Sequence, residues 1–192
     1  AGDTGLLIET DGQALGSGVD SLVEQTQTGT VTNSTTGRDY GQLSTNTVEF
    51  TGANAKQGWY FHLPEAGERL LDPMAFFDGS NVLEVISEIP AKGSEEVGET
   101  CNPTSRPARK FRTFLNIMDG KPPSIQIIDF SGDGLYNATV DNGVSRMSAP
   151  NAEVRFDSGD IAVRQAAGGG GPNDSLRRMP VLSLRPDWRQ LQ

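Results

Sequence analysis

Turn signals recur at short intervals along this chain, and they leave no room for long regular elements. Asp-Gly, Pro-Pro, Asp-Asn-Gly and Asp-Ser-Gly steps stand within residues 78–81, 119–123, 141–143 and 157–159. Short apolar runs lie between them, several of which alternate apolar with polar residues. Such runs, bounded by residues that favour tight turns, predict hairpins. We therefore predict an all-β fold of antiparallel strands and hairpins.

The apolar patterns also place the individual strands. The expected strands are residues 58–63, 69–77, 82–89, 111–118 and 124–128, with weaker ones at 152–156, 160–164 and 181–184. The clearest hairpin is "FFDGSNVLEVI", where an Asp-Gly turn separates two apolar runs. Strands at this spacing fit β-propeller-like blades or, as an alternative, a β-sandwich.

One segment has a helical pattern. Within residues 19–25, Val19, Leu22 and Val23 stand at the spacing of one helix face. The segment is too short for more than two turns, so we expect at most one short helix. The polar, Thr-rich residues 26–37 predict either a loop or an edge strand.

Length sets the domain count. A chain of 192 residues has the size of one domain, so we expect residues 1–192 to form a single β domain or a piece of a larger one. The chain begins with Ala1, which is typical of a mature product or an excised piece. The glycine run at residues 168–172 predicts a flexible joint before the C-terminal piece.

The charge balance narrows the choice of partners. The chain carries 16 Lys and Arg against 25 Asp and Glu, a net charge of −9. That charge repels nucleic acid and anionic lipid surfaces, and no apolar run approaches the roughly 20 residues of a membrane span. We expect neither nucleic acid binding nor direct membrane insertion. Acidic character is compatible with divalent cations and with secretion.

The stretch "IIDFSGDGLYN" carries the strongest candidate for a binding site. Asp129, Ser131 and Asp133 alternate, so that their oxygens could point into one tightly curled loop. Leu135 would offer its carbonyl, and Asn137 stands at the ninth position, directly or through a water. This spacing of oxygen ligands predicts a Ca²⁺ site.

The pattern departs from an EF-hand in two respects. No helices are expected beside the loop, and the twelfth position holds Val140 instead of Glu, with Asp141 one residue later. An EF-hand is therefore excluded. Two interpretations remain from the residues alone, a calcium loop on a β scaffold and an Asp-Gly turn with solvated carboxylates.

Catalytic motifs are absent from the sequence. His62 is the sole histidine, no nucleophile elbow or phosphate loop is present, and His62 lies in an expected strand where it should point outward. Cys101 is the sole cysteine, which rules out a disulfide within the chain and a thiolate zinc site. We expect no catalytic residues, no organic cofactor and no enzyme activity.

Residues 56–73 resemble a known family. The matching positions are Lys56, Gly58, Trp59, Tyr60, Leu63, Pro64, Gly67, Glu68, Arg69, Asp72 and Pro73. They resemble the K-x-G-W-Y-x-x-L-P block, the G-E-R step and the D-P pair in the C-terminal region of the type IV pilus tip-associated adhesin and biogenesis factors, the PilC/PilY-like proteins. The segment around Tyr40, the Ile89-Pro90 pair with Cys101, and the terminal "DWRQLQ" are also similar. After Cys101 the family's Gly-Gly segment is replaced by residues 102–106.

The resemblance implies a fold and a role. It implies the C-terminal fragment of a β-propeller domain with a calcium loop, whose ligands map to Asp129, Ser131, Asp133 and Asn137. It further implies a non-enzymatic component of the pilus tip that acts in pilus assembly, in the control of extension and retraction, and in surface adhesion. The implied partners are minor pilins or other tip subunits and a host or abiotic surface. The implied location is extracellular, at the pilus tip or cell surface after export through the periplasm.

Two further contact sites and two other functions follow from the residues. The basic residues within 106–112, and an Arg-rich tail that includes Arg177 and Arg185, are candidate contacts for an acidic partner. The alternative function is a secreted carbohydrate-binding β domain with a structural calcium, in which Trp59 and Tyr60 would be exposed. A third function is a domain of a secreted hydrolase that uses two carboxylates.

Overall fold

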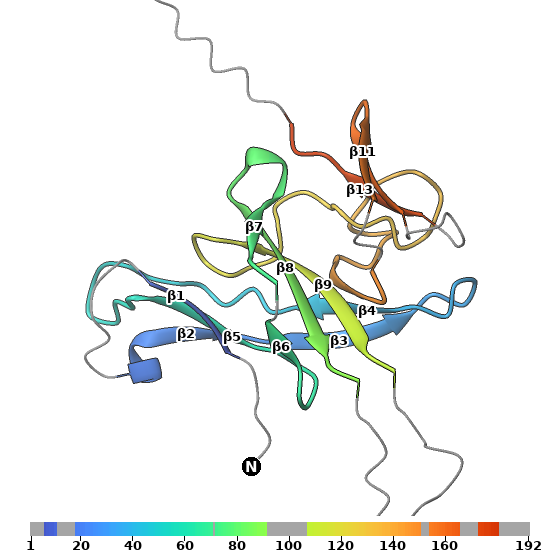
Figure 1. Ribbon diagram of the computed structural model, residues 1–192. Coiled ribbons are helices and arrows are strands. Elements are labelled where there is room, and N and C mark those ends of the chain that lie inside the picture. The colour runs from blue at the N-terminus through green and yellow to red at the C-terminus, as the bar shows by residue number, and fades with distance from the viewer. Residues whose placement is uncertain are drawn as a thin grey trace, which may run out of the picture.

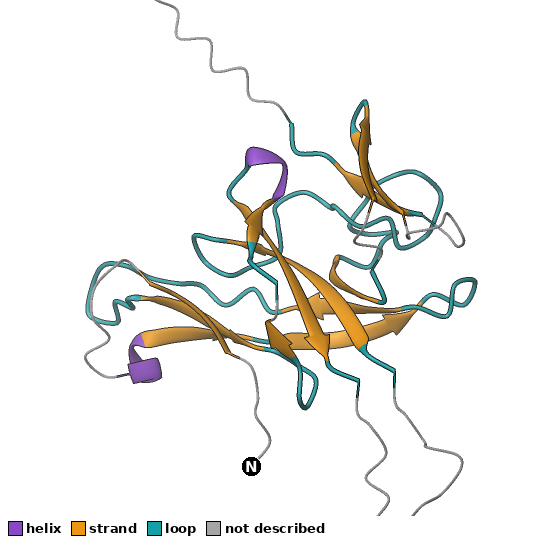
Figure 2. Cartoon of the chain, in the orientation of Figure 1, coloured by secondary structure: helices purple, strands orange, loops and turns teal. Residues whose placement is uncertain are grey.

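The computed structural model describes residues 6–10, 18–70, 72–91, 107–150, 154–165 and 173–180. Its elements are β1 (Leu6–Thr10), η1 (Gly18–Ser21), β2 (Leu22–Gln25), β3 (Gln27–Thr32), β4 (Asp39–Leu43), β5 (Gly58–His62), β6 (Arg69–Leu70), β7 (Ala75–Phe76), η2 (Phe77–Gly79), β8 (Val82–Ile89), β9 (Arg109–Asn116), β10 (Val144–Ser148), β11 (Val154–Ser158), β12 (Ile161–Gln165) and β13 (Asp174–Arg177). Strands dominate the described chain, and its helices are the short 3-10 segments η1 and η2 (Figure 2).

The strands form three sheets (Figure 1). One sheet has the order β1-β5-β2, and a second runs β3-β4-β10-β9-β8-β6, with β7 also paired to β8. The third has the order β11-β12-β13. Neighbours pair antiparallel except β2 and β5, which are parallel. The predicted all-β, antiparallel fold is confirmed, and its layered sheets are sandwich-like; propeller blades are not shown and stay a prediction.

The hairpin predicted in "FFDGSNVLEVI" is confirmed. Strand β7 pairs antiparallel with β8, with Phe76 opposite Leu83, and η2 makes the turn between them. Asp78 adopts a φ of 50°, one of the few left-handed non-glycine residues in the described chain. The expected strand over residues 69–77 is divided into β6 and β7 at Pro73, because proline has no N–H to donate to a ladder.

Two predicted elements are wrong. The helix expected over residues 19–25 survives as η1 alone, and residues 22–25 form β2, because parallel pairing with β5 buries Leu22 and Gln25. Residues 124–128 form no strand and make a single bridge, between Ile128 and Leu176. Ile127 and Ile128 are both buried, so the chain does not alternate there as a half-buried strand would.

Other predictions have mixed outcomes. The Thr-rich residues 26–37 do contain an edge strand, β3. Strands β4 and β10 had no clear sequence signal, because β4 contains Tyr-Gly-Gln and β10 contains Ser-Arg-Met. Residues 181–184, the glycine run at 168–172 and Cys101 lie outside the described residues.

The core lies on both faces of the seven-stranded sheet. Neighbouring residues of β9 point to opposite faces, so Phe114 belongs to one buried cluster and Leu115 to the other. Trp59 and Leu63, from the segment that resembles the pilus family, pack in the Leu115 cluster. The Phe114 cluster contains Ile127, Ile128, Ala162 and Leu176. The segment that leads into the candidate metal loop is therefore held by the Phe114 cluster.

A buried ion pair links the pilus-like block to β10. Glu68 is fully buried, and Nη2 of Arg146 lies 2.9 Å from both of its carboxylate oxygens. Arg146 also donates to Oγ1 of Thr113 at 2.9 Å. Burial lowers the pKa of Arg146, and the Glu68 charge opposes that shift. Each of the two charges depends on the other for compensation.

Replacement of Glu68 tests this dependence. Glu68→Gln keeps the side chain's shape but leaves the Arg146 charge buried without its counter-ion. We expect the free energy of unfolding to fall by about 3–5 kcal/mol in urea denaturation. The matched control is Glu65→Gln, which removes an exposed pair with Arg109 (3.4 Å) and should cost less than about 1 kcal/mol. Equal losses in the two variants would contradict the assignment.

Candidate metal-binding loop

The loop of residues 129–141 leaves a well-anchored segment. Ile128 bridges Leu176 of β13, and the N–H of Arg177 donates to the carbonyl of Ile127 at 2.9 Å. Because Ile127 and Ile128 are buried, the chain enters the loop from a fixed position. It leaves the loop into β10, a strand inside the seven-stranded sheet.

Asp129 organises the first half of the loop. Its Oδ1 accepts the N–H of Gly132 at 2.6 Å, and its Oδ2 accepts the N–H of Gly134 at 2.9 Å. Gly132 and Gly134 have φ values of 76° and 78°, which L-residues with a side chain rarely adopt. The two glycines therefore let the backbone curl around this carboxylate.

Three side chains in the loop each accept the backbone N–H two residues further along the chain: those of Ser131, Asp133 and Asn137. The Ser131 hydroxyl accepts the N–H of Asp133 at 3.4 Å, and it donates to the side-chain Oδ1 of Asp129 at 3.3 Å. Asp133 accepts the N–H of Leu135 at 2.8 Å, and Asn137 accepts the N–H of Thr139 at 2.9 Å. All three side chains are exposed, and local turns of this kind keep short polar side chains at the surface of a loop.

Asp141 closes the loop from inside. Its side chain is fully buried, and its Oδ1 accepts the N–H groups of Phe130 and Ser131, both at 3.0 Å. Its Oδ2 accepts the N–H of Asn137 at 2.8 Å. The sequence placed Asp141 one residue beyond the twelfth position but gave it no role. That near match was the signal that could have identified it.

The predicted ligands therefore share one small loop, though not one ready-made cage. Asp129, Ser131 and Asp133 belong to a connected hydrogen-bond network, whereas Leu135 and Asn137 extend the loop toward Asp141. No group of three His, Cys, Asp or Glu residues able to hold a metal occurs in the described part of the chain. The donors are hard oxygens with lone pairs to spare, two carboxylates among them, which fits a weak Ca²⁺ site.

Comparisons with known proteins place the fold. No protein-family model and no curated protein matches the chain. Among solved structures, it is similar to the crystal structure of the Pseudomonas aeruginosa PilY1 C-terminal domain, with a TM-score of 0.56 and 15% sequence identity. The likeness establishes a shared fold. It covers 84% of this chain and 33% of that chain, so this chain spans about a third of the PilY1 domain's length.

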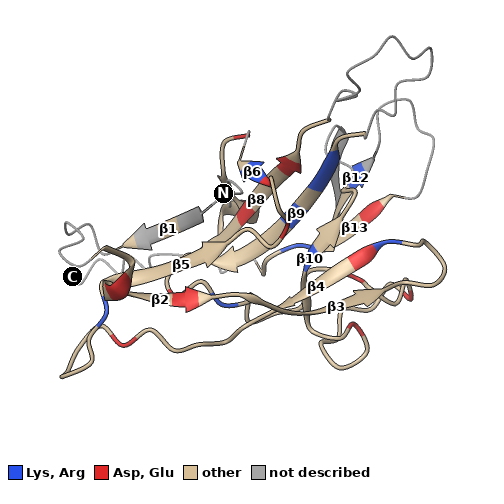
Figure 3. Ribbon diagram, turned by 90° about the horizontal axis from the view of Figure 1, so that it is seen from below, with Lys and Arg blue, Asp and Glu red and all other residues tan. Residues whose placement is uncertain are grey.

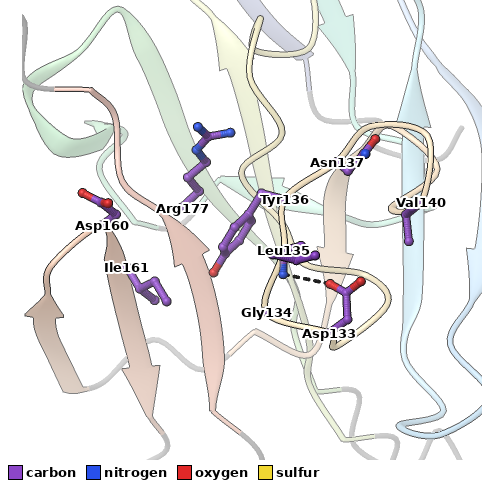
Figure 4. A pocket seen from close by; sticks show the side chains of 9 residues that line it. All are labelled: Asp133, Gly134, Leu135, Tyr136, Asn137, Val140, Asp160, Ile161 and Arg177. Carbon is purple, nitrogen blue, oxygen red and sulfur yellow. Dashed lines mark hydrogen bonds between the residues drawn. The ribbon is translucent and has the colours of Figure 1, made fainter.

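Tyr136 belongs to the loop, and its side chain points toward the third sheet. Figure 4 shows its ring pointing from the loop toward Ile161, while Arg177 points away from it. Its hydroxyl oxygen is buried and has no hydrogen-bond partner among the described residues. Burial, together with the nearby charges of Asp129 and Asp141, raises the pKa of Tyr136 to about 12, and the Arg177 charge opposes this shift. The phenol is therefore neutral at physiological pH.

A groove of about 490 Å³ runs beside this tyrosine. Its lining residues come from the loop and from the hairpin of β12 and β13: Asp133, Gly134, Leu135, Tyr136, Asn137, Val140, Asp160, Ile161 and Arg177 (Figure 4). Leu135 and Val140 are strongly exposed in this surface, at 67% and 50%. The loop thus presents its polar side chains and two apolar ones on the same edge of the molecule.

The other candidate residues are placed as follows. His62 points outward at the end of β5, as predicted, with half of its side chain exposed. Trp59 is fully buried and donates from Nε1 to the carbonyl of Ile117 at 2.9 Å. It therefore offers no exposed ring for a sugar, which removes half of the aromatic pair required by the carbohydrate-binding alternative. Tyr60 is half-buried.

The basic residues of 106–112 do not form one exposed patch. Lys and Arg gather at the start of β9 (Figure 3), but Arg112 is buried against Glu84 at 2.9 Å. Arg109 and Lys110 are exposed and lie near Glu65 and Glu88, at 3.4 and 3.5 Å. In the described part of this stretch, residues 107–112, two cations therefore reach the surface, each beside a carboxylate. Arg106 and Arg185 lie outside the described residues.

The role of Asp141 can be tested without metal. In Asp141→Asn, one of the two acceptor oxygens becomes a donor, so at least one of the three backbone N–H groups loses its partner. We expect a loss of about 1.5–3 kcal/mol in the free energy of unfolding. Amide hydrogen exchange should accelerate at Phe130, Ser131 and Asn137. Asp133→Asn, which alters an exposed carboxylate, is the matched control and should change stability by less than about 0.5 kcal/mol.

The unpartnered hydroxyl of Tyr136 gives a second prediction. Tyr136→Phe removes a buried polar atom that has no partner, so the free energy of unfolding should rise by about 1 kcal/mol at neutral pH. The folded-state pKa of about 12 lies above the ordinary 10.0, so the folded state holds the phenol proton more tightly. This stabilisation is complete below pH 10 and is lost as the pH rises toward 12. The advantage of the Phe variant should therefore grow across that window; an unchanged difference would contradict the burial of this hydroxyl.

Proposed function

We propose that this chain is a calcium-binding, non-enzymatic module of a type IV pilus tip, which acts in pilus assembly, in the control of extension and retraction, and in surface adhesion. The proposal rests on one observation: the fold and the candidate calcium loop occur together in the same chain. A fold similar to the PilY1 C-terminal domain over 84% of the chain contains, at residues 129–137, a curled loop with calcium-ligand spacing. The sequence resemblance at residues 56–73 points to the same family independently.

Five residues would hold the ion. Asp129 and Asp133 would supply two charged carboxylates. Ser131 and Asn137 would supply neutral side-chain oxygens, and Leu135 would supply its backbone carbonyl. Asp129 is already oriented by the N–H groups of Gly132 and Gly134, so little ordering remains for that ligand. Because just two ligands are charged, the dissociation constant should fall near about 0.1–1 mM, the range of extracellular calcium modules.

Calcium would act by changing the order of the loop. The ion supplies positive charge that offsets the repulsion between the Asp129 and Asp133 carboxylates. Asp141 then links the loop to the buried layer, because it holds the N–H groups of Phe130 and Asn137 from within the core. Occupancy of the loop would thereby alter the surface at Leu135 and Val140. That surface change is the proposed basis for control of extension and retraction.

The proposal also assigns partners and a location. As in the family that the sequence resembles, the module would sit at the fibre tip outside the cell, against minor pilins or other tip subunits, and face a host or abiotic surface. In the described ranges, no helix has the length and apolar character needed to cross a membrane. An acidic chain of net charge −9 would meet neither nucleic acid nor an anionic bilayer favourably.

Calorimetry and thermal melts test the calcium site. Wild type should show saturable Ca²⁺ binding, and its melting temperature should be higher in calcium than in chelator, because a ligand that binds the folded state stabilises it. Asp133→Ala should lose both effects. The matched control is Asp160→Ala, an exposed carboxylate on the same groove outside the loop, which should keep both.

The opposite results would also be informative. If wild type binds no Ca²⁺, residues 129–141 are a structural turn and the calcium part of the proposal is wrong. If Asp160→Ala loses binding as fully as Asp133→Ala, the ion lies in the groove and is not held by the loop.

A further inference from the structure

We propose that the groove between the loop and the β12–β13 hairpin binds an extended peptide segment of a partner that carries apolar and basic side chains, and that Ca²⁺ competes with this segment. The proposed binding of the peptide segment depends on the groove alone. The competition rests on the proposed calcium site, because Asp133 belongs both to the predicted ligand set and to the groove lining.

The apolar residues of the groove are arranged for an extended ligand. Figure 4 shows Ile161, Tyr136, Leu135 and Val140 spread along the groove instead of surrounding one pit. Leu135 is 67% exposed and Val140 is 50% exposed. These two apolar side chains therefore lie at the surface of the loop and do not pack into a core. A row of apolar side chains of this kind fits successive side chains of a peptide.

Tyr136 supplies a hydrogen bond that nothing in the described chain uses. Its hydroxyl oxygen is buried and has no hydrogen-bond partner among the described residues. A buried donor without an acceptor is unfavourable, so a ligand that provides an acceptor gains from it. Backbone carbonyls of an extended segment are such acceptors, and they repeat along the direction of the groove.

Charge selects a basic partner. Asp133 and Asp160 contribute carboxylates to the groove, against the one guanidinium of Arg177. With a net charge of −9 on the whole chain, a lysine or arginine in the partner would be attracted and an acidic segment repelled.

Competition follows from the shared carboxylate. A partner lysine that pairs with Asp133 would lose that contact when Ca²⁺ coordinates the same oxygens. By thermodynamic reciprocity, the segment must lower the affinity of the loop for Ca²⁺ by the same factor. Bound Ca²⁺ would then weaken binding of the partner segment, and the bound segment would weaken binding of Ca²⁺.

The test uses short blocked peptides and the whole chain in chelator. The probe has leucine between two lysines; one control replaces the lysines with glutamates, and another replaces the leucine with serine. Chemical-shift titration should show saturable binding of the probe at Leu135, Tyr136 and Ile161, and about tenfold weaker binding of each control. No shifts at these residues, or equal shifts with the glutamate peptide, would overturn the proposal.

Matched variants tie the binding to the groove. Leu135→Ala should weaken the probe about fivefold or more, and Tyr136→Phe about threefold, because one loses apolar contact and the other a hydrogen bond. Met118→Ala is the control, since Met118 is comparably exposed at 62% but lies outside the groove. An equal loss in Met118→Ala would mean non-specific association and would overturn the assignment.

Titration of the probe in the presence of Ca²⁺ distinguishes the groove proposal from the calcium-site proposal. Saturating Ca²⁺ should weaken the probe about fivefold or more in wild type, and the effect should vanish in Asp133→Ala. If calorimetry shows Ca²⁺ binding but probe affinity is unchanged, the competition is wrong while the calcium site stands. If Ca²⁺ does not bind at all, the proposed function loses its calcium site, and the groove is still decided by the chelator experiment and its variants.

Discussion

A buried network of charges holds the third sheet against the rest of the molecule, and the candidate site depends on it. Asp174 at the start of β13 is nearly fully buried and lies between Arg38 and Arg112, while Arg112 also pairs with Glu84 of β8. Removal of charges from water is costly, so such a network is tolerated when each group keeps its partners. This requirement fixes β13, and β13 in turn holds Ile127 and Ile128 in front of the loop.

The loop illustrates how environment separates chemically identical side chains. Asp141 is fully buried and its oxygens accept three backbone N–H groups, so it serves the fold. Asp133 is exposed and accepts a single local N–H, so it can take a ligand at little structural cost. Asp129 lies between these extremes, since its bonds to Gly132 and Gly134 shape the loop while its position leaves it at the surface. The two extremes divide the work of the loop: Asp141 holds its backbone in place, and Asp133 stays available at its surface.

Local signals in the sequence predicted the parts of this structure that local chemistry decides. The Asp-Gly turn before β8 was predicted correctly, and residues 26–37 were narrowed to a loop or an edge strand, because each depends on a few adjacent residues. The strand β2 was mistaken for a helix because its fate is decided by pairing with β5, far along the chain. The role of Asp141 was missed for the same reason, since burial and three backbone donors are properties of the folded loop and not of the residue type.

The pairing of β4 with β10 has a consequence for how the chain reaches this structure. Tyr40 lies opposite Met147, so the place of β4 inside the seven-stranded sheet is completed by residues made much later. During synthesis, the β3–β4 hairpin has no partner strand along its β4 edge until β10 is made, and contacts of such long sequence separation form slowly. Most residues of the waiting hairpin are threonine, glycine or glutamine, and its large apolar residues are Val31, Tyr40 and Leu43. A polar hairpin of this kind can remain soluble until its late partner arrives.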